Sequence, residues 1–288
     1  MSHDALHGYA EVAARAALKA GSFLARSLGR AGMVRTKRSA IDLVTEVDRA
    51  SERLIQTALW RADPRFGFLG EEHGEQRHGA PYRWVVDPLD GTTNFVHGVP
   101  IFGVSIALQR LGAPAPSQGG GPILVGVIYD PMRRELFVAT KGGGAFLNGK
   151  RIRVSPTRTL RHSLLSTGFS SKFLRRDEPY LGWFRVLQRH SHGVRRVGST
   201  VWCLAAVAAG RLEAFYERDL WPWDMAAGSL LIEEAGGRVT DFEGGPVRFD
   251  HGRLVASNGR IHRELLRQLR TAGTSARHAR QAAARRMR

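Results

Sequence analysis

Residues 84–95, which read WVVDPLDGTTNF, are the most informative stretch of this chain. Their apolar, partly β-branched start predicts a buried strand that reaches Asp87, and Pro88 is expected to end it because proline lacks a backbone N–H. Asp90 follows three residues after Asp87, with the carbonyl oxygen of Leu89 between them. On a turn these oxygens could converge, and such ligands suit a hard cation such as Mg²⁺.

The same stretch continues with groups that suit an anion. Gly91, Thr92 and Thr93 offer consecutive backbone N–H groups and two hydroxyls, which bind anions where a helix or turn begins. A cation site beside an anion site is what a metal-assisted phosphate enzyme requires. The alternative is a structural turn, because Asp-Pro and Asp-Gly are common turn dipeptides.

Two further acidic stretches favour the functional interpretation. FLGEEHGE (68–75) ends an apolar run in Glu71 and Glu72, and WPWDMAAG (221–228) places Asp224 where an alanine-rich helix should begin. Taken singly, a Glu-Glu pair is usually solvated and an Asp at a helix start is usually a cap. Together with residues 84–95 they give three acidic clusters, each at the end of an apolar element.

These motifs, in this order and spacing, resemble the inositol monophosphatase family of Mg²⁺-dependent, Li⁺-sensitive phosphatases. The resemblance covers roughly residues 10–270 and implies an αβαβα sandwich, an α/β (α+β layered) fold shared with fructose-1,6-bisphosphatase. The quoted segments that carry it are GEE (70–72), DPLDGTTNF (87–95), WDMAAG (223–228), IDLVTEVD (41–48), VGVIYDP (125–131), KGGGAFLNG (141–149), RRVGST (195–200) and FYE (215–217).

The resemblance implies a ligand set for two Mg²⁺ ions. Glu71, Asp87 and the Leu89 carbonyl would hold one ion. Asp87, Asp90 and Asp224 would hold the second, so that Asp87 bridges them. Some family members imply a third, weaker site near Glu71.

The resemblance also assigns catalytic and substrate-binding roles. Gly91 and Thr92, beside Asp90, would bind phosphate. Thr92, paired with Asp48, would position the attacking water together with the Glu71 metal site. Glu217 matches a ligand of substrate hydroxyls, and Ser199 and Thr200 lie on the neighbouring substrate loop. Lys37 precedes the IDLVT segment, where its alignment with the family is loose.

Electrostatics explain why such a site needs metal. Two unit charges 4 Å apart repel by about 4 kcal/mol at an effective dielectric constant near 20. Four carboxylates in one pocket would therefore reject a phosphate dianion, whereas two Mg²⁺ ions cancel their charge. Direct attack by water needs no protein nucleophile, and Cys203 lies in the apolar run VWCLAAVAA, where a core role is expected.

The rest of the chain predicts layered sheets and helices. Expected helices cover 4–28, 46–61, 178–190, 200–210, 224–235 and 260–271, and expected strands cover 66–69, 84–87, 102–108, 124–129, 135–139, 212–216, 238–241 and 254–256, with a turn-rich β segment over 141–155. We expect an N-terminal half (1–155) with most of the metal ligands, a C-terminal half (156–271) with Asp224 and the substrate loop, and a disordered basic tail (272–288). GAPAPSQGGGP (112–122) predicts a flexible loop.

Composition limits the class of protein. The 288 residues carry a formal charge of +17, of which residues 251–288 supply nine through ten arginines and one acid. A hydrophobic content of 43% excludes a disordered chain, and no apolar run is long enough for a membrane span. The N-terminus lacks the apolar core of a secretory signal, and one cysteine allows neither an internal disulfide nor a cysteine zinc site. A cytoplasmic location is therefore expected.

Several alternatives remain open from the sequence. Hydrolysis of myo-inositol 1-phosphate is the leading hypothesis, and histidinol phosphate or a range of sugar phosphates is the main alternative. A different class is an RNA-associated regulator that uses the basic tail. A homodimer is common among relatives.

Overall fold

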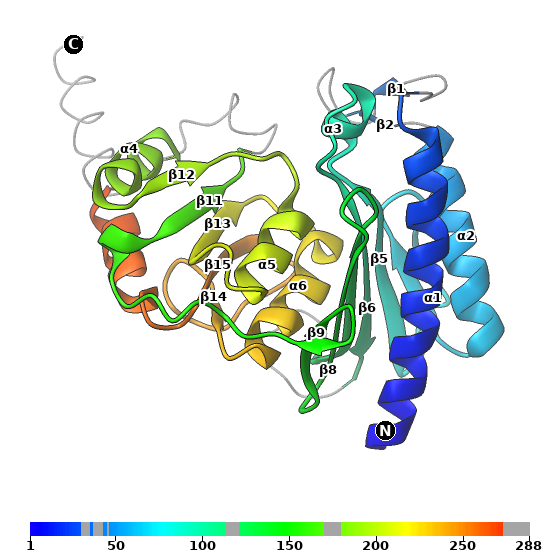
Figure 1. The fold of residues 1–288 in the computed structure, drawn as a ribbon. Helices are drawn as coiled ribbons and strands as arrows, with labels where there is room; N and C mark the ends of the chain where they lie inside the picture. The colour runs from blue at the N-terminus through cyan, green and yellow to red at the C-terminus, as the bar shows by residue number, and fades with distance from the viewer. Residues whose placement is uncertain (30–34, 37–42, 45, 113–120, 170–179, 273–288) are drawn as a thin grey trace, which may run out of the picture.

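The computed structural model describes residues 1–29, 35–36, 43–44, 46–112, 121–169 and 180–272, and its elements stack in five layers (Figure 1). Two helices cover one face of an eight-stranded sheet, and two more helices separate that sheet from a five-stranded one. A last helical layer covers the far side of the smaller sheet. The αβαβα arrangement implied by the family resemblance is confirmed.

The first layer consists of α1 (His3–Ser27) and α2 (Glu46–Ala62), close to the expected ranges of 4–28 and 46–61. The buried face of α1 is mostly alanine, which lets the helix lie close to the sheet. The approach is closest at Gly21, where a Cβ would stand 2.4 Å from the ring of Tyr129. Small residues thus set how closely α1 approaches the sheet.

The large sheet has the order β10-β9-β8-β7-β6-β5-β3-β4 and is antiparallel except where β3 pairs with β5. Its strands are β3 (Gly67–Gly70), β4 (Gly74–Gln76), β5 (Tyr82–Asp90), β6 (Gly103–Arg110), β7 (Ile123–Asp130), β8 (Glu135–Thr140), β9 (Gly144–Leu147) and β10 (Lys150–Arg151). The expected strands in this region are confirmed, and the short β4 was not expected.

The end of β5 corrects one expectation. Pro88 does not end the strand, which continues to Asp90. The pairing with β6 shifts between Asp87 and Asp90, and a proline is tolerated at such a bulge because the ladder is interrupted there. The bulge gives the DPLD segment its irregular path while the surrounding strand stays in the sheet.

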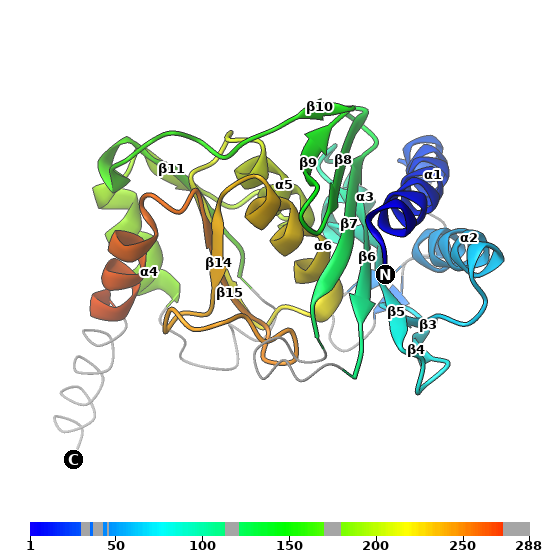
Figure 2. The ribbon, with the colours of Figure 1, turned by 90° about the horizontal axis from the view of Figure 1, so that it is seen from below.

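The second half forms the remaining layers, seen from below in Figure 2. Helices α5 (Thr200–Ala208) and α6 (Pro222–Glu234) lie between the sheets, and α4 (Tyr180–His190) packs outside with the helix over 262–272. The small sheet has the order β12-β11-β13-β15-β14, formed by β11 (Leu164–Thr167), β12 (Gly193–Arg195), β13 (Ala214–Arg218), β14 (Arg238–Thr240) and β15 (Arg253–Ser257). The sequence did not predict β11 or β12.

Short elements complete the description, and none of them was expected. They are β1 (Arg35–Thr36), β2 (Leu43–Val44), α3 (Thr92–Val96) and the 3₁₀ turn η1 (Leu160–His162). Among the described residues, no helix is both long and apolar enough to cross a bilayer.

The chain passes from the large sheet to the small one between Arg151 and Leu164, near the expected boundary at 155. One core cluster nevertheless joins the two halves, since it contains Ala107 of the large sheet and Phe215 of the small one, packed around α5 and α6. Most of the 112–122 loop and all but the first residue of the 272–288 tail lie outside the described residues.

Candidate active site

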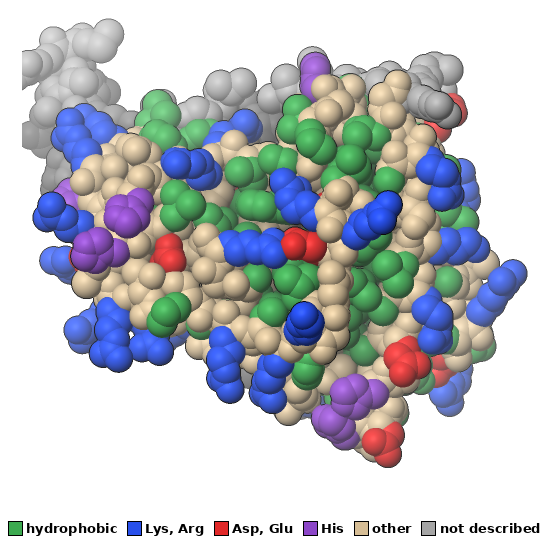
Figure 3. Space-filling model, viewed as in Figure 1, with side chains coloured by type: hydrophobic (Ala, Val, Ile, Leu, Met, Phe, Trp, Pro, Cys, Tyr) green, Lys and Arg blue, Asp and Glu red, His purple; other side chains and the backbone are tan. Residues whose placement is uncertain are grey.

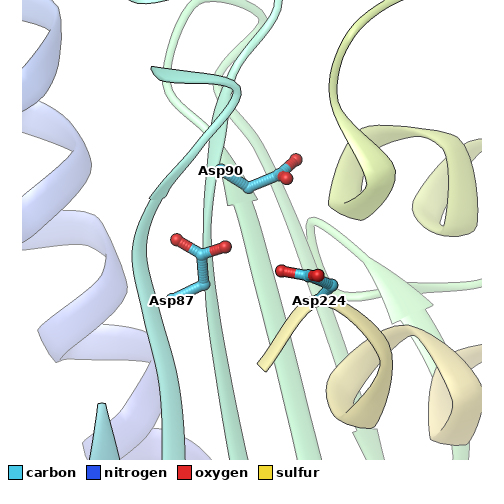
Figure 4. A group of neighbouring side chains, drawn as sticks. All are labelled: Asp87, Asp90 and Asp224. Atoms are coloured by element: carbon cyan, nitrogen blue, oxygen red, sulfur yellow. The ribbon is translucent and has the colours of Figure 1, made fainter. Parts of the chain in front are cut away.

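Three carboxylates gather where β5 ends and α6 begins (Figure 4). Asp87, Asp90 and Asp224 each place one oxygen within 4.8 Å of the others. Asp87 is 2% exposed, and the other two are partly exposed at the edge of the same space. The structure therefore brings together three of the residues that the sequence singled out as metal ligands.

Local structure explains how each carboxylate reaches this point. Asp87 and Asp90 flank the bulge of β5, and the backbone N–H of Leu89 donates to Asp87 Oδ1 at 3.0 Å. Asp224 lies in the first turn of α6, which begins with Pro222, and its Oδ2 accepts from the N–H of Trp221 at 2.7 Å. The helix expected over 224–235 is thus present, but it begins two residues earlier, at Pro222.

All three carboxylates have pKa values above their usual range. Desolvation is the main cause for Asp87, whose pKa lies well above its usual range, and the charges of Glu71, Asp90 and Asp224 add to it. Desolvation also raises the pKa of Asp90 to about 6, against hydrogen bonds from Ser199 and Val201, and raises that of Asp224. A divalent cation would remove this repulsion, and the all-oxygen donor set fits Mg²⁺.

Thr92 and Asp48 meet at the edge of this cluster. Gly91 has a φ of 90°, a left-handed conformation that favours glycine, and α3 begins immediately after it. The Thr92 hydroxyl lies 3.1 Å from Asp48 Oδ1 and 3.1 Å from the carbonyl oxygen of Leu89. Asp48 is fully buried in the first turn of α2. The pairing of these two side chains is present.

The loop that the sequence predicted to bind substrate reaches the cluster through the start of α5. The Ser199 hydroxyl donates to Asp90, and the N–H of Val201 donates to Asp90 Oδ2 at 3.0 Å. The Thr200 hydroxyl donates to Glu217 Oε2 at 3.1 Å. Burial raises the pKa of Glu217 to about 8, although the Thr200 hydrogen bond opposes the shift. Ser199, Thr200 and Glu217 therefore form one hydrogen-bonded group beside Asp90.

Glu71 stands slightly apart from the three carboxylates. It follows β3, and its N–H donates to the carbonyl oxygen of Val86 at 3.3 Å. Its charge raises the pKa of both Asp87 and Asp224, which places it close enough to act on them. Lys37 lies outside the described residues.

Cys203 takes no part in the site. It is buried in α5, where desolvation raises the pKa of its thiol far above the usual range. A thiol held neutral in this way is a poor nucleophile. The expected core role is confirmed.

Two residues of the site were missed in the sequence. The Asn94 amide donates to the carbonyl oxygens of Ile101 and Val197, both at 2.8 Å, and so connects α3 to the segment that precedes α5. Glu52, buried in α2, accepts hydrogen bonds from the segment that follows Glu71. Asn94 stands inside a motif and could have been noticed, whereas nothing in the local sequence distinguishes Glu52 from a solvated helix residue.

The layered fold and the carboxylate cluster between its sheets define a metal-dependent phosphatase. The model of the inositol monophosphatase family matches residues 6–274. The chain belongs to this family.

Individual relatives agree with that assignment. The Nus factor SuhB of Pseudomonas aeruginosa is 45% identical, over 88% of this chain and 93% of the relative. An inositol-1-monophosphatase of Rhizobium meliloti is 43% identical, again over 88% and 93%.

Solved structures share the fold. The extragenic suppressor protein suhB from Bartonella henselae superposes with a TM-score of 0.82 at 42% identity, over 90% of this chain and 97% of that one. Inositol monophosphatase from Anabaena (Nostoc) sp. PCC 7120 gives 0.81 at 40% identity, over 92% and 96%.

Proposed function

We propose that this chain hydrolyses myo-inositol 1-phosphate to myo-inositol and phosphate with the help of Mg²⁺. The observation that carries the proposal is the cluster of Asp87, Asp90 and Asp224, whose oxygens lie within 4.8 Å of one another. Relatives that are 42–43% identical are named inositol-1-monophosphatase, which supports the choice of substrate.

We propose the metal ligands that the family pattern implies. Glu71, Asp87 and the Leu89 carbonyl would hold one ion, and Asp87, Asp90 and Asp224 a second, with a weaker third near Glu71. When bound, Mg²⁺ supplies positive charge for the phosphate dianion, polarises its oxygens and lowers the pKa of water.

The protein's own groups orient the reactants. A hydroxyl donates once and accepts twice, so Thr92 can donate to Asp48 and still accept a hydrogen bond from the attacking water. Gly91 and Thr92 lie at the start of α3, where backbone N–H groups have no helical acceptor and can bind phosphate oxygens. Water attacks phosphorus, the ester P–O bond breaks, and the alcohol leaves with a proton.

The group formed by Ser199, Thr200 and Glu217 supports a polyol substrate. A carboxylate accepts hydrogen bonds from ring hydroxyls, and Glu217 lies beside Asp90 through its contact with Thr200. Histidinol phosphate and other sugar phosphates share the phosphate end of the substrate, so they are the alternatives to test.

A phosphate-release screen tests the proposal. About twenty phosphate monoesters would be compared by kcat/KM with Mg²⁺ present, including inositol 1-phosphate and histidinol phosphate. We expect inositol 1-phosphate to be the best substrate, activity to vanish with EDTA, and LiCl to inhibit where equal KCl does not. A hundredfold preference for histidinol phosphate would overturn the substrate assignment.

A role in RNA binding is the second candidate. Relatives named Nus factor SuhB are 41–45% identical, and ten of the arginines lie in residues 251–288. Most of the tail lies outside the described residues, and basic side chains are spread over the face seen in Figure 3 rather than gathered in one patch. Absence of RNA retention by the full-length chain at low salt would overturn this candidate.

The homodimer and the cytoplasmic location stay predictions. Light scattering during gel filtration tests the first, and fractionation of cells tests the second.

A further inference from the structure

Glu52 is a fully buried carboxylate behind the proposed metal site. It lies on α2, one helical turn after Asp48, and both side chains are 0% exposed. Residues four apart share one face of a helix, so α2 presents both carboxylates to the same region. Asp48 meets Thr92 there, whereas nothing in the proposed reaction uses Glu52.

Within the part of the chain that the structure describes, the hydrogen bonds to Glu52 come from the segment that follows β3. Its Oε2 accepts from the N–H of Glu72 at 2.9 Å, and its Oε1 accepts from the N–H of His73 at 3.0 Å. The Nδ1 atom of the His73 ring lies 2.5 Å from the same Oε1. A buried charge is costly unless such donors satisfy it, so Glu52 and this segment hold each other in place.

The neighbouring backbone is shaped for this contact. A Cβ at Gly70 would stand 2.5 Å from the carboxylate of Glu52, so a glycine is needed for the close approach. The next residue, Glu71, donates its N–H to Val86 of β5 at 3.3 Å. Glu71 is therefore fixed on one side by β5 and on the other by the contacts of Glu52.

We propose that Glu52, with His73, is a positioning residue that aims the Glu71 carboxylate at the metal site. The inference rests on the proposed function, because it assumes that Glu71 binds Mg²⁺. Glu52 itself is not proposed as a ligand, because its two oxygens are directed at the backbone of Glu72 and His73 and at the His73 ring. Partners of this kind typically change metal affinity 10- to 100-fold when they are removed.

Calorimetric titration of Mg²⁺ into the full-length protein tests the proposal without relying on activity. For Glu52→Gln, in which an amide N–H replaces one acceptor, we expect Mg²⁺ binding to weaken about tenfold. At saturating Mg²⁺ the kcat should return to within about twofold of the wild type, because the ligands themselves are intact. The midpoint of thermal unfolding without Mg²⁺ is measured in parallel to show that the variant is folded.

Glu75→Gln is the matched control for charge. Glu75 lies on β4 close to the same segment, but its side chain is 37% exposed and pairs with Arg83 at 2.8 Å. We expect its Mg²⁺ affinity to match the wild type. An equal loss of affinity in both variants, or none in Glu52→Gln, would overturn the proposal.

Two substitutions of His73 separate positioning from packing. Asparagine places an amide N–H near the position of the Nδ1 atom, so His73→Asn should keep wild-type affinity, whereas His73→Ala should lose several-fold. The His73 side chain is 34% exposed, so both variants should fold. Equal affinity in the two variants would contradict the role of His73. A wild-type protein that binds no Mg²⁺ at all would instead contradict the proposed function.

Discussion

The hydroxyl of Thr92 lies 3.1 Å from Oδ1 of Asp48, although the two residues are 44 positions apart in the chain. Asp48 comes from the first turn of α2, outside the large sheet, and Thr92 from the first turn of α3, beside the carboxylate cluster. The contact joins the outer helical layer to the point where β5 ends. In our account it fixes the direction in which Thr92 can accept a hydrogen bond from water.

Removal of that hydroxyl should slow the reaction without abolishing metal binding. For Thr92→Val, which keeps the shape of the side chain, we expect kcat to fall at least about a hundredfold. The Mg²⁺ affinity from calorimetry should stay within about threefold of the wild type. Thr93→Val is the control and should keep full activity, because Thr93 is exposed in the same turn and its hydroxyl is not among the groups proposed to bind phosphate. Equal kcat in the two variants would contradict the role of Thr92.

Without Mg²⁺, the stability of the protein should depend on pH because the buried carboxylates of the site have raised pKa values. The pKa values of Asp90 and Glu217 are raised to about 6 and about 8, above those of the unfolded chain. The folded state therefore binds more protons, and its stability falls as the pH rises through these values. We expect the unfolding temperature without Mg²⁺ to drop between pH 5 and pH 8, and Mg²⁺ to raise it more at pH 8. A flat profile would argue against a buried carboxylate cluster.

A buried histidine should make the stability of the protein fall as the pH is lowered toward 4, which is the opposite trend. His262 lies between the hydroxyls of Thr240 and Ser257, both at 2.8 Å, and burial lowers its pKa to about 4. The unfolded chain takes up the proton first, so this contribution to stability is complete above about pH 6.5 and lost toward pH 4. It amounts to at most about 3 kcal/mol.

His262→Gln checks this, because glutamine can bond both hydroxyls but does not titrate. Denaturant unfolding at pH 7 and pH 4.5 should show a smaller loss of stability in the variant than in the wild type. Identical losses would show that another group governs acid unfolding.

The positions of the acidic site residues were predictable, because Glu71 and Asp87 follow apolar runs and Asp224 stands at the start of an apolar helix. The length of β5 was not, since the bulge that carries it past Pro88 depends on the register with β6. The helix α3 has five residues, too few for a helical period to be visible. Strands β11 and β12 were missed because their sequences, LLST and GVR, show no alternation of apolar and polar residues.

The partners of Asp48 and Glu52 could not be predicted from local sequence patterns. The resemblance to the family pointed to Asp48, whereas Glu52 has no motif of its own. Its hydrogen-bond donors lie 20 and 21 residues further along the chain, beyond any local pattern. Only the packing of α2 against the large sheet shows that this glutamate is buried rather than solvated.

Asp224→Asn gives the most direct test of the central claim that the carboxylate cluster binds Mg²⁺ to hydrolyse a phosphate monoester. The asparagine oxygen can still accept from the N–H of Trp221, so the start of α6 should remain intact. Removing one of the repelling charges should leave the Mg²⁺-free variant at least as stable as the wild type.

The measurement is phosphate release from myo-inositol 1-phosphate over a range of Mg²⁺ concentrations, with Asp250→Asn as a control at an exposed ion pair. We predict that Asp224→Asn loses most of its kcat and its affinity for Mg²⁺, while Asp250→Asn behaves as the wild type. Full activity of Asp224→Asn, or wild-type activity that EDTA leaves unchanged, would contradict the account.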